Sequence, residues 1–287
     1  MKNIKNAALA ATTLAALSGN AIAADYSDDI HKNDYQWSQF NLMYAIGEKP
    51  SGEDNLKHDY LEMEFGGRSG VVDLYGYVDV FNLLGSDSSD SDKKDGASKM
   101  FMKLAPRFSL DGMTGKDLSF GPVQEVYIAT LFNWGGGGIT GSRPNDVKGQ
   151  PDVAINGDVN NAFFGLGSDV MVPWLGKVGM NVYGLYDANA KDWNGYQFSM
   201  NWFKPFVNFD NGSFISYQGY VDYQFEMDTS NGGVSNGGVM FNGIYWHSDR
   251  YSVGYGLKAY SDVYGIKDSS AFASSGFAHY FAASYKF

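Results

Sequence analysis

The chain has 287 residues, a formal net charge of −11 and no cysteine, and 16% of its residues are aromatic. The acidic balance argues against nucleic-acid binding, which needs basic surfaces for the phosphates, and the lack of cysteine excludes a disulfide framework. After residue 23, no apolar run approaches the roughly 20 residues of a membrane-spanning helix, so a helical membrane protein is excluded.

The first 23 residues have the pattern of a secretory signal peptide. Lys2 and Lys5 precede an apolar stretch over residues 8–17, and Ala21-Ile22-Ala23 forms a small-residue cleavage site. The stretch is too short to span a bilayer, so an uncleaved anchor is the weaker interpretation. We expect residues 1–23 to be removed and residues 24–287 to form one domain. That domain is a soluble periplasmic or secreted protein, or an outer-membrane β-barrel.

Segments that alternate apolar and polar side chains recur along the rest of the chain, each near the ~9–11 residues of a tilted membrane-spanning strand. There are twelve such segments, an even number, as in single-chain bacterial barrels. They cover residues 37–46, 58–65, 72–82, 100–110, 123–132, 163–172, 177–186, 195–203, 213–225, 239–247, 250–260 and 276–287. The sequence therefore predicts an all-β fold, a 12-stranded antiparallel transmembrane β-barrel.

The last segment shows the alternation clearly. Phe277, Phe281 and Tyr285 share one apolar face, whereas Ser284 and Lys286 share the other. An ordinary sandwich edge strand would give a similar pattern, but an unpaired aromatic edge invites aggregation, and closure into a barrel removes the edge. This segment is therefore expected to close the barrel.

The connections alternate in length, as they do in a barrel with both termini in the periplasm. The expected external loops include residues 86–98, which are rich in Asp and Ser, and the glycine-rich residues 135–161. Residues 66–70, 173–176 and 247–250 are expected to be tight periplasmic turns, with less tight links at 111–122 and 204–212. Asp87, Asp90, Asp92 and Asp95 are expected in a solvated loop, with cation bridging to lipopolysaccharide as the alternative.

Charged and tyrosine side chains on neighbouring segments are expected to face the lumen, because carboxylates that face lipid are costly. Acids on two segments would then lie opposite bases on the next. The candidate lumen-lining residues are Glu62, Glu64, Asp73, Tyr75, Tyr77, Asp79, Lys103 and Arg107. The same alternation places further side chains inside, namely Ser216, Gln218, Asp222, Gln224, Arg250 and Lys258.

Such a lumen has two interpretations. Inward acid–base pairs can fill the interior of a structural or receptor barrel with a plugged, non-conducting lumen. Alternatively, twelve strands enclose more room than the about eight strands whose side chains alone fill the interior, so a narrow channel remains. Tyrosines among carboxylates and amides suit a solute with one flat apolar part and one hydroxylated part, because rings stack and hydroxyls bond to ionised groups.

Catalysis is not expected. The chain has four histidines, His31, His58, His247 and His279, and none has the sequence setting of a base beside a nucleophile. No spacing of His and carboxylate residues resembles a zinc site. The expectation is a protein with no catalytic residue, cofactor or metal.

Several long strings resemble the Tsx family of nucleoside-specific channels, and two of them are most similar to the vibrio-type outer-membrane protein K (OmpK) group. The first set is Asp59-Tyr60-Leu61-Glu62-Met63-Glu64, Asp73-Leu74-Tyr75-Gly76-Tyr77-Val78-Asp79, Ala105-Pro106-Arg107-Phe108-Ser109-Leu110-Asp111 and Asp117-Leu118-Ser119-Phe120-Gly121-Pro122. The OmpK-like strings are Gly167-Ser168-Asp169-Val170-Met171-Val172-Pro173-Trp174 and Asn242-Gly243-Ile244-Tyr245-Trp246-His247-Ser248-Asp249-Arg250.

The resemblance implies a monomeric twelve-stranded barrel in the outer membrane of a Gram-negative bacterium, in contact with lipid and lipopolysaccharide. It also implies passive nucleoside uptake and external loops that serve as a bacteriophage receptor. The family's characterised channel uses aromatic residues near its external mouth. This chain departs from that pattern, because residues 47–57, the first expected external loop, contain no aromatic residue.

Overall fold

The computed structural model describes residues 24–51, 56–83, 99–136, 141–143, 153–155, 158–230, 232–270 and 272–287. The expected signal peptide 1–23, the acidic segment from Asp87 to Asp95, and Gly137 and Gly138 of the glycine run lie outside these residues. Within the described ranges, no helix has the length and apolar character to cross a membrane.

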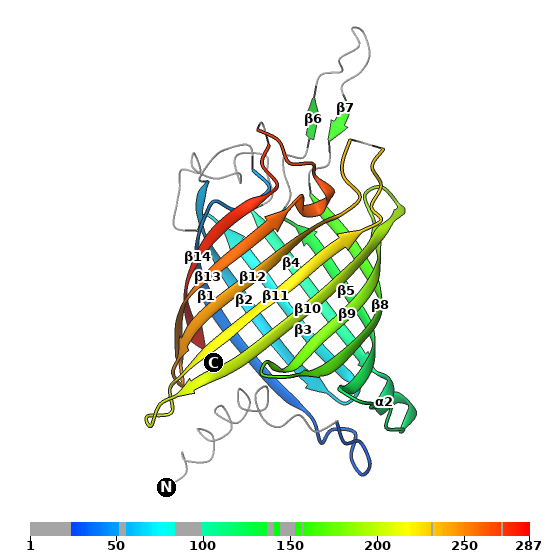
Figure 1. Cartoon of the computed structure of the whole chain (residues 1–287), viewed down its shortest axis with the longest axis vertical. Helices are drawn as coiled ribbons and strands as arrows, with labels where there is room; N and C mark the ends of the chain where they lie inside the picture. Colours follow the sequence, from blue (N-terminus) through cyan, green and yellow to red (C-terminus); the bar gives the residue numbers. More distant parts are fainter. Residues whose placement is uncertain are drawn as a thin grey trace.

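The predicted barrel is confirmed. Twelve antiparallel strands close on themselves in the order β1-β14-β13-β12-β11-β10-β9-β8-β5-β4-β3-β2 (Figure 1). The strands of the barrel are β1 (Tyr35–Ile46), β2 (Lys57–Ser69), β3 (Val72–Phe81), β4 (Met100–Ser109), β5 (Val123–Gly135), β8 (Val159–Val172), β9 (Gly176–Asp187), β10 (Asp192–Asn208), β11 (Phe214–Phe225), β12 (Gly237–His247), β13 (Tyr251–Ser261) and β14 (Gly276–Lys286). The last strand closes the ring on the first, with Leu42 opposite Ala283.

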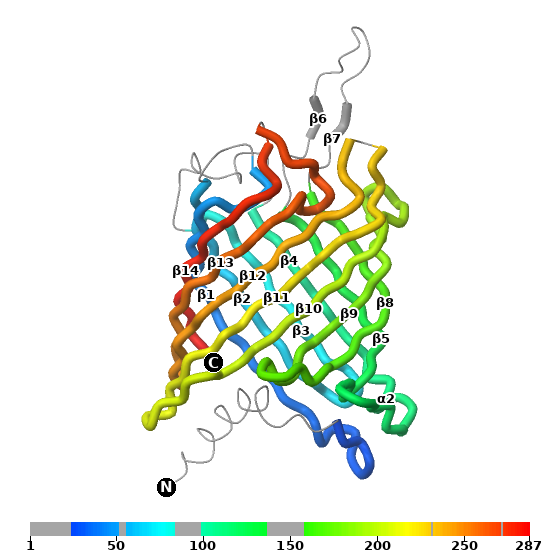
Figure 2. Tube along the Cα trace, in the orientation of Figure 1, coloured from blue at the N-terminus to red at the C-terminus, as the bar shows by residue number. Residues whose placement is uncertain are grey.

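The two ends of the barrel differ. The C-terminus and the segment that precedes β1 lie at one end, here called the terminal end, together with the short helix α2 (Leu110–Thr114) (Figure 2). The other end, here called the loop end, has the two-stranded sheet of β6 (Gly141–Arg143) and β7 (Val153–Ile155) (Figure 1). A short 3-10 helix, η1 (Val263–Gly265), lies in the connection between β13 and β14.

Several sequence-based boundaries are wrong. The expected external loop over residues 135–161 is shorter, because β5 extends to Gly135 and β8 begins at Val159. Three further boundaries are wrong near the terminal end. Residues 66–69, expected in a tight turn, continue β2, because the ring of Trp37 lies over Gly66 and keeps that part of the strand packed. Residues 204–208, expected in a link, continue β10, which is paired with β11 through an irregularity between Pro205 and Val207. Residue 110, expected at the end of a strand, begins α2, because the side chain of Ser109 caps the backbone N–H of Gly112 at 3.1 Å.

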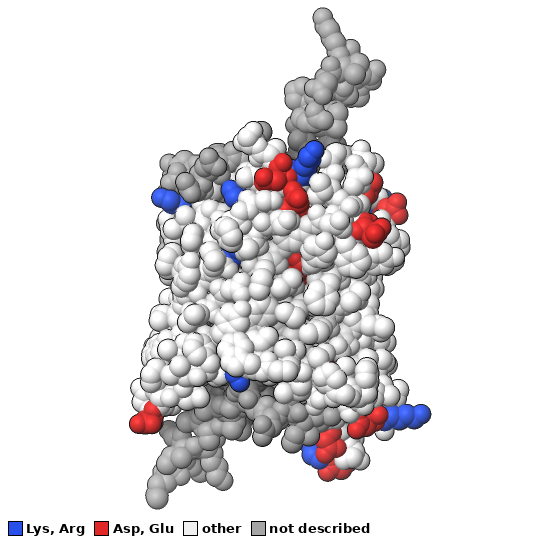
Figure 3. All heavy atoms as spheres, viewed as in Figure 1, with Lys and Arg blue, Asp and Glu red and all other residues white. Residues whose placement is uncertain are grey.

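The predicted alternation of faces explains the barrel's surface. Outward apolar side chains are well exposed, among them Leu166, Val182 and Phe281. Figure 3 shows a wall almost free of charge between two rims that carry Lys, Arg, Asp and Glu. Lipid can cover such a wall, and the polar face of each strand is left for the interior.

Candidate functional site

A cavity of about 1910 Å³ occupies the interior of the barrel. Every strand of the barrel contributes to its wall, and residues from both ends line it. The structure places all eight candidate residues on this wall: Glu62, Glu64, Asp73, Tyr75, Tyr77, Asp79, Lys103 and Arg107. Of the further inward candidates, Gln218, Asp222, Gln224 and Lys258 also line the cavity.

Two of the inward candidates do not line it. Ser216 is fully buried within the wall. The prediction for Arg250 is wrong, because this residue lies before β13, in the exposed turn that follows β12. Its guanidinium is 3.5 Å from the hydroxyl of Tyr285, an outward residue. Alternation fixes the face of a residue only within a strand, and Arg250 lies just outside one.

One part of the wall carries a dense network of acids and bases, here called the wall network: Arg68, Asp73, Arg107, Glu125, Asp169 and Lys177. The guanidinium of Arg107 lies 2.9 Å from Asp73 on one side and 2.9 Å from Asp169 on the other. Arg68 lies 3.0 Å from Glu125, and Lys177 lies 3.2 Å from Asp169. The expected pairing of Arg107 with Asp73 is therefore present in the structure.

Tyrosines complete the hydrogen bonds of the wall network. Tyr35 donates to Asp73 at 3.1 Å, and Tyr127 donates to Glu125 at 2.7 Å. The guanidinium of Arg107 also stacks over the ring of Tyr127, 4.1 Å from its centroid. These ion pairs lie within one arc of the ring, from β2 to β9, and the widest step is from Arg68 on β2 to Glu125 on β5.

A second group of acids has no such partners. Glu62, Glu64 and Asp79, here called the acidic strip, form no ion pair among the residues that the structure describes. Neutral donors hold Glu62 and Glu64 instead. Asn41 donates to Glu62 at 2.6 Å, Gln39 donates to Glu64 at 2.6 Å, and Tyr75 donates to Glu64 at 2.8 Å.

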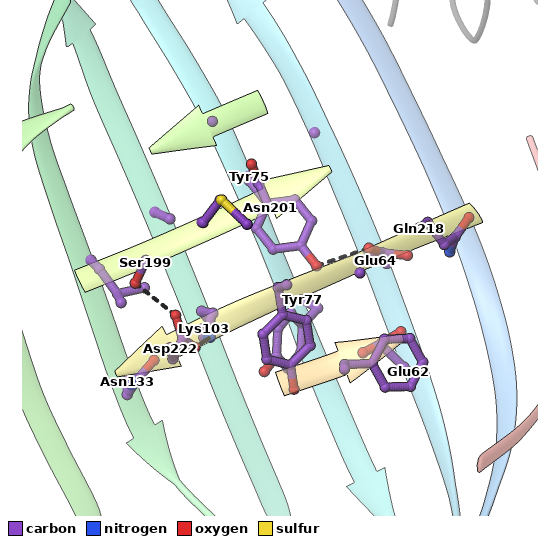
Figure 4. A pocket seen from close by; sticks show the side chains of 18 of the residues that line it. Glu62, Glu64, Tyr75, Tyr77, Lys103, Asn133, Ser199, Asn201, Gln218 and Asp222 are labelled. Carbon is purple, nitrogen blue, oxygen red and sulfur yellow. Dashed lines mark hydrogen bonds and ion pairs between the residues drawn. The ribbon is translucent and has the colours of Figure 1, made fainter. Parts of the chain in front are cut away.

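Lys103 does not face the acidic strip, where alternation had placed its partners. Its ammonium group lies 3.5 Å from the carboxylate of Asp222 on β11 (Figure 4). Ser199 donates to the same carboxylate at 2.6 Å. The Lys103 ammonium also lies over the rings of Tyr77 and Tyr220, at 5.8 Å and 5.9 Å from their centroids.

Sequence reasoning missed an aromatic group nearer the loop end. The ammonium group of Lys258 lies 5.2 Å from the ring centroid of Tyr280 and 5.3 Å from that of Tyr260. Glu48, from the connection between β1 and β2, accepts a hydrogen bond from Tyr280 at 2.8 Å. The inward face of Tyr280 was readable from the alternation of the last strand. No periodic signal marks Glu48, because it lies in a loop.

Residues 47–57 contain no aromatic residue, but aromatic side chains from other parts of the chain line the cavity. Tyr60, Tyr220 and Tyr280 line the cavity, and so does Tyr264, from the connection between β13 and β14.

One serine–histidine contact bears on the question of catalysis. The Ser216 hydroxyl and Nε2 of His247 are 2.9 Å apart. Ser216 is fully buried and also hydrogen-bonds to Gln218 at 3.0 Å, so a substrate has no access to its oxygen. Nδ1 of His247 is buried, and none of the described residues hydrogen-bonds to it, so none of them orients the ring as a third group. In the described ranges, no three His, Asp or Glu side chains are arranged to hold a metal ion.

Comparison with known proteins gives a match over almost the whole chain. A family model described as "Nucleoside-specific channel-forming protein, Tsx" matches residues 32–287. "Outer membrane protein OmpK" of Vibrio parahaemolyticus is 63% identical over 285 residues, which are 99% of this chain and 100% of that protein. "Nucleoside-specific channel-forming protein Tsx" of Klebsiella aerogenes is 27% identical over 99% of this chain and 100% of its own length. The Tsx protein of Salmonella typhimurium is 30% identical over 86% and 83%.

Proposed function

Because the chain belongs to the Tsx family of channel-forming proteins of the Gram-negative outer membrane, we propose that its barrel passively admits small solutes, with nucleosides as the preferred class. The observation that carries the proposal is the continuous polar and aromatic lining of the interior cavity. At about 1910 Å³, this cavity is larger than the roughly 300–1,000 Å³ of a typical small-molecule site. In this proposal the protein catalyses no reaction, and it functions as a monomeric barrel.

The chemistry of the lining suits a nucleoside. A base can stack on tyrosine rings such as Tyr75 and Tyr77, which lie side by side with centroids 6.1 Å apart. Ribose hydroxyls can donate to the carboxylates of Glu62 and Glu64, which have no ionic partner among the described residues and so keep acceptor capacity. The wall network favours the alternative of a plugged barrel, so conductance has to decide between the two.

Single-channel conductance of the refolded barrel in a planar bilayer tests the proposal. We expect small current steps that adenosine closes in a saturable way, with ribose and adenine as weaker blockers, because each presents only half of the recognised solute. A barrel that never conducts would establish the plugged alternative. Conductance that adenosine does not reduce would leave a channel for another class of solute.

Substitution of the tyrosines tests the binding surface. Y75A and Y77A are each expected to weaken adenosine block by roughly tenfold, since base–aromatic stacking contributes about 1–3 kcal/mol per base. Tyr223 is a matched control, because it lies on the outward face and is 45% exposed. Y223A should leave the block unchanged, and equal effects of all three variants would contradict a binding role for the inward rings.

We also propose that the connections at the loop end serve as a bacteriophage receptor. The separate sheet of β6 and β7 supports this, since it stands apart from the closed barrel at that end (Figure 1). Deletion of residues 141–155 should abolish adsorption of phage selected on cells that carry this protein, while adenosine block stays intact. Adsorption that survives the deletion would contradict a receptor role for this sheet.

A further inference from the structure

The contact between Lys103 and Asp222 joins opposite walls of the barrel. Lys103 is on β4 and Asp222 is on β11. Around the ring, β10, β9, β8 and β5 separate the two strands on one side, and β12, β13, β14, β1, β2 and β3 separate them on the other. An ion pair between these strands therefore crosses the lumen. In contrast, Arg107 pairs with Asp73 on the adjacent strand β3.

The two sides of this contact differ in chemistry. On the side of β3 and β2 lie Tyr77, Tyr75 and the acidic strip. On the side of β5, β9 and β10 lie neutral amides, namely Asn133, Asn181 and Asn201. A solute that travels along the lumen has to pass on one side of the contact or displace it.

Each end of the contact has other partners on or near its own wall. Asp222 accepts hydrogen bonds from Ser199 at 2.6 Å and from Gln197 at 3.4 Å, both on the neighbouring strand β10. The ammonium group of Lys103 already lies 5.8 Å from the ring of Tyr77, on the neighbouring strand β3. The ion pair itself is long at 3.5 Å, and both side chains remain partly accessible, at 18% and 20% exposure. When Lys103 and Asp222 separate, each charged group therefore still has a partner near its own wall.

We propose that Lys103 and Asp222 form a crossbar that sets the largest solute the lumen admits. The pair is a specificity-determining element of the channel, so the inference rests on the proposed function. A narrow solute passes beside the closed crossbar. A wider one passes only when the Lys103 side chain turns onto Tyr77 and leaves Asp222 with Ser199 and Gln197.

The test compares single-channel conductance and polymer exclusion in K103A and D222A with the wild type. Each substitution removes one end of the crossbar, and we expect each to raise conductance at least twofold. We also expect polyethylene glycols of a larger size to enter. The two changes alter the lumen charge in opposite directions, so a rise in both identifies removal of an obstacle rather than an electrostatic effect.

Three further variants control the result. K103R keeps a cation that can pair with Asp222, so it should retain the wild-type polymer exclusion limit that K103A loses. The exchange K103D with D222K rebuilds the crossbar in reverse and should restore the wild-type size limit. K204M removes a lysine outside the cavity lining and should change nothing. Heat-modifiable electrophoretic mobility identifies the variants that have folded.

The outcomes separate the crossbar from the proposed function. Unchanged conductance and polymer exclusion in folded K103A and D222A would overturn the crossbar while leaving a conducting wild-type channel in place. A silent wild type with conducting variants would overturn passive transport and support the crossbar as a seal. If the wild type, K103A and D222A all failed to conduct, both passive transport and the crossbar would be overturned.

Discussion

At the scale of single residues, Arg107 is the cation on which the wall network depends. Its side chain is 14% exposed, and it lies 2.9 Å from both Asp73 and Asp169, whose own side chains are 12% and 5% exposed. R107M would leave Asp73 without its closest cation, and Asp169 with Lys177 alone. We expect a loss of about 3–5 kcal/mol in the free energy of unfolding, as when one partner of a buried ion pair is removed. Urea unfolding of the wild type and of R107M in lipid vesicles measures this difference in the free energy of unfolding.

Lys177 is the control for this prediction. It lies 3.2 Å from the same Asp169, but its side chain is 32% exposed. K177M should cost at most about 1 kcal/mol, as for exposed pairs, because Arg107 still neutralises the carboxylate. Similar losses in the two variants would show that Arg107 is not the centre of the network.

Tyr26 attaches the segment before β1 to the terminal end of the barrel. Its hydroxyl donates to Glu125 at 2.7 Å. Burial raises the pKa of Tyr26 from 10 to about 12, and the nearby Glu125 carboxylate also favours the neutral phenol. Because the folded pKa is above the unfolded one, the attachment is fully present below pH 10 and is lost as the pH rises toward 12.

A spin label tests this attachment, since the chain has no cysteine and S27C would carry the only one. We expect the label to be immobile at pH 8 and mobile near pH 12. In the Y26F background its mobility should not change across this range, because the titrating hydroxyl is gone. A mobility change of equal size in Y26F would assign the transition to another group.

At the scale of elements, glycines on β12 and β13 allow aromatic rings to lie flat against the inner wall. Gly254 is opposite Tyr245, and Gly243 is opposite Gly256. A Cβ atom at Gly254 would collide with the ring of Tyr245, and one at Gly256 would collide with the ring of Phe241. Both aromatic residues line the cavity, so the two glycines keep these rings out of the lumen.

G254A and G256A are therefore expected to narrow the channel. Each added methyl group pushes a ring inward, and single-channel conductance should fall by about half or more, with a tighter polymer exclusion limit. Gly184 is the matched control, because a Cβ atom there would lie 3.1 Å from the ring of Trp193, which is exposed and absent from the cavity lining. G184A should leave conductance unchanged. A fall of equal size in G184A would point to general distortion of the barrel.

The elements show what a sequence can and cannot specify. The faces of the strand from Val72 to Phe81 were predictable, because a period of two separates Asp73 and Asp79 from Val78 and Val80 whatever the rest of the chain does. The partner of Lys103 was not predictable. Alternation places a residue inside the barrel, but the distant strand that it reaches depends on ring closure and tilt, which no local pattern contains.

At the scale of the whole molecule, the lumen carries more negative than positive charge. Among the described lining residues, carboxylates outnumber Lys and Arg, and the bases Arg68, Arg107, Lys103 and Lys177 are already paired with acids. The acidic strip is left without an ionic partner in the described part of the chain. A charged lining with low-dielectric walls concentrates ions of the opposite sign, so the channel should prefer K⁺ to Cl⁻.

The reversal potential across a KCl gradient measures this preference. In the wild type its sign should be that of a cation-selective pore, and the preference should weaken as salt rises toward 1 M, where the screening length falls to about 3 Å. The double variant E62Q E64Q should lose most of the preference while conductance persists, because two carboxylates become neutral amides of similar shape. Asp210 is the control, since it lies in an exposed turn outside the cavity lining. If D210N reduced the preference as much, the selectivity would come from the net charge of the protein, and the acidic strip would have no special part in it.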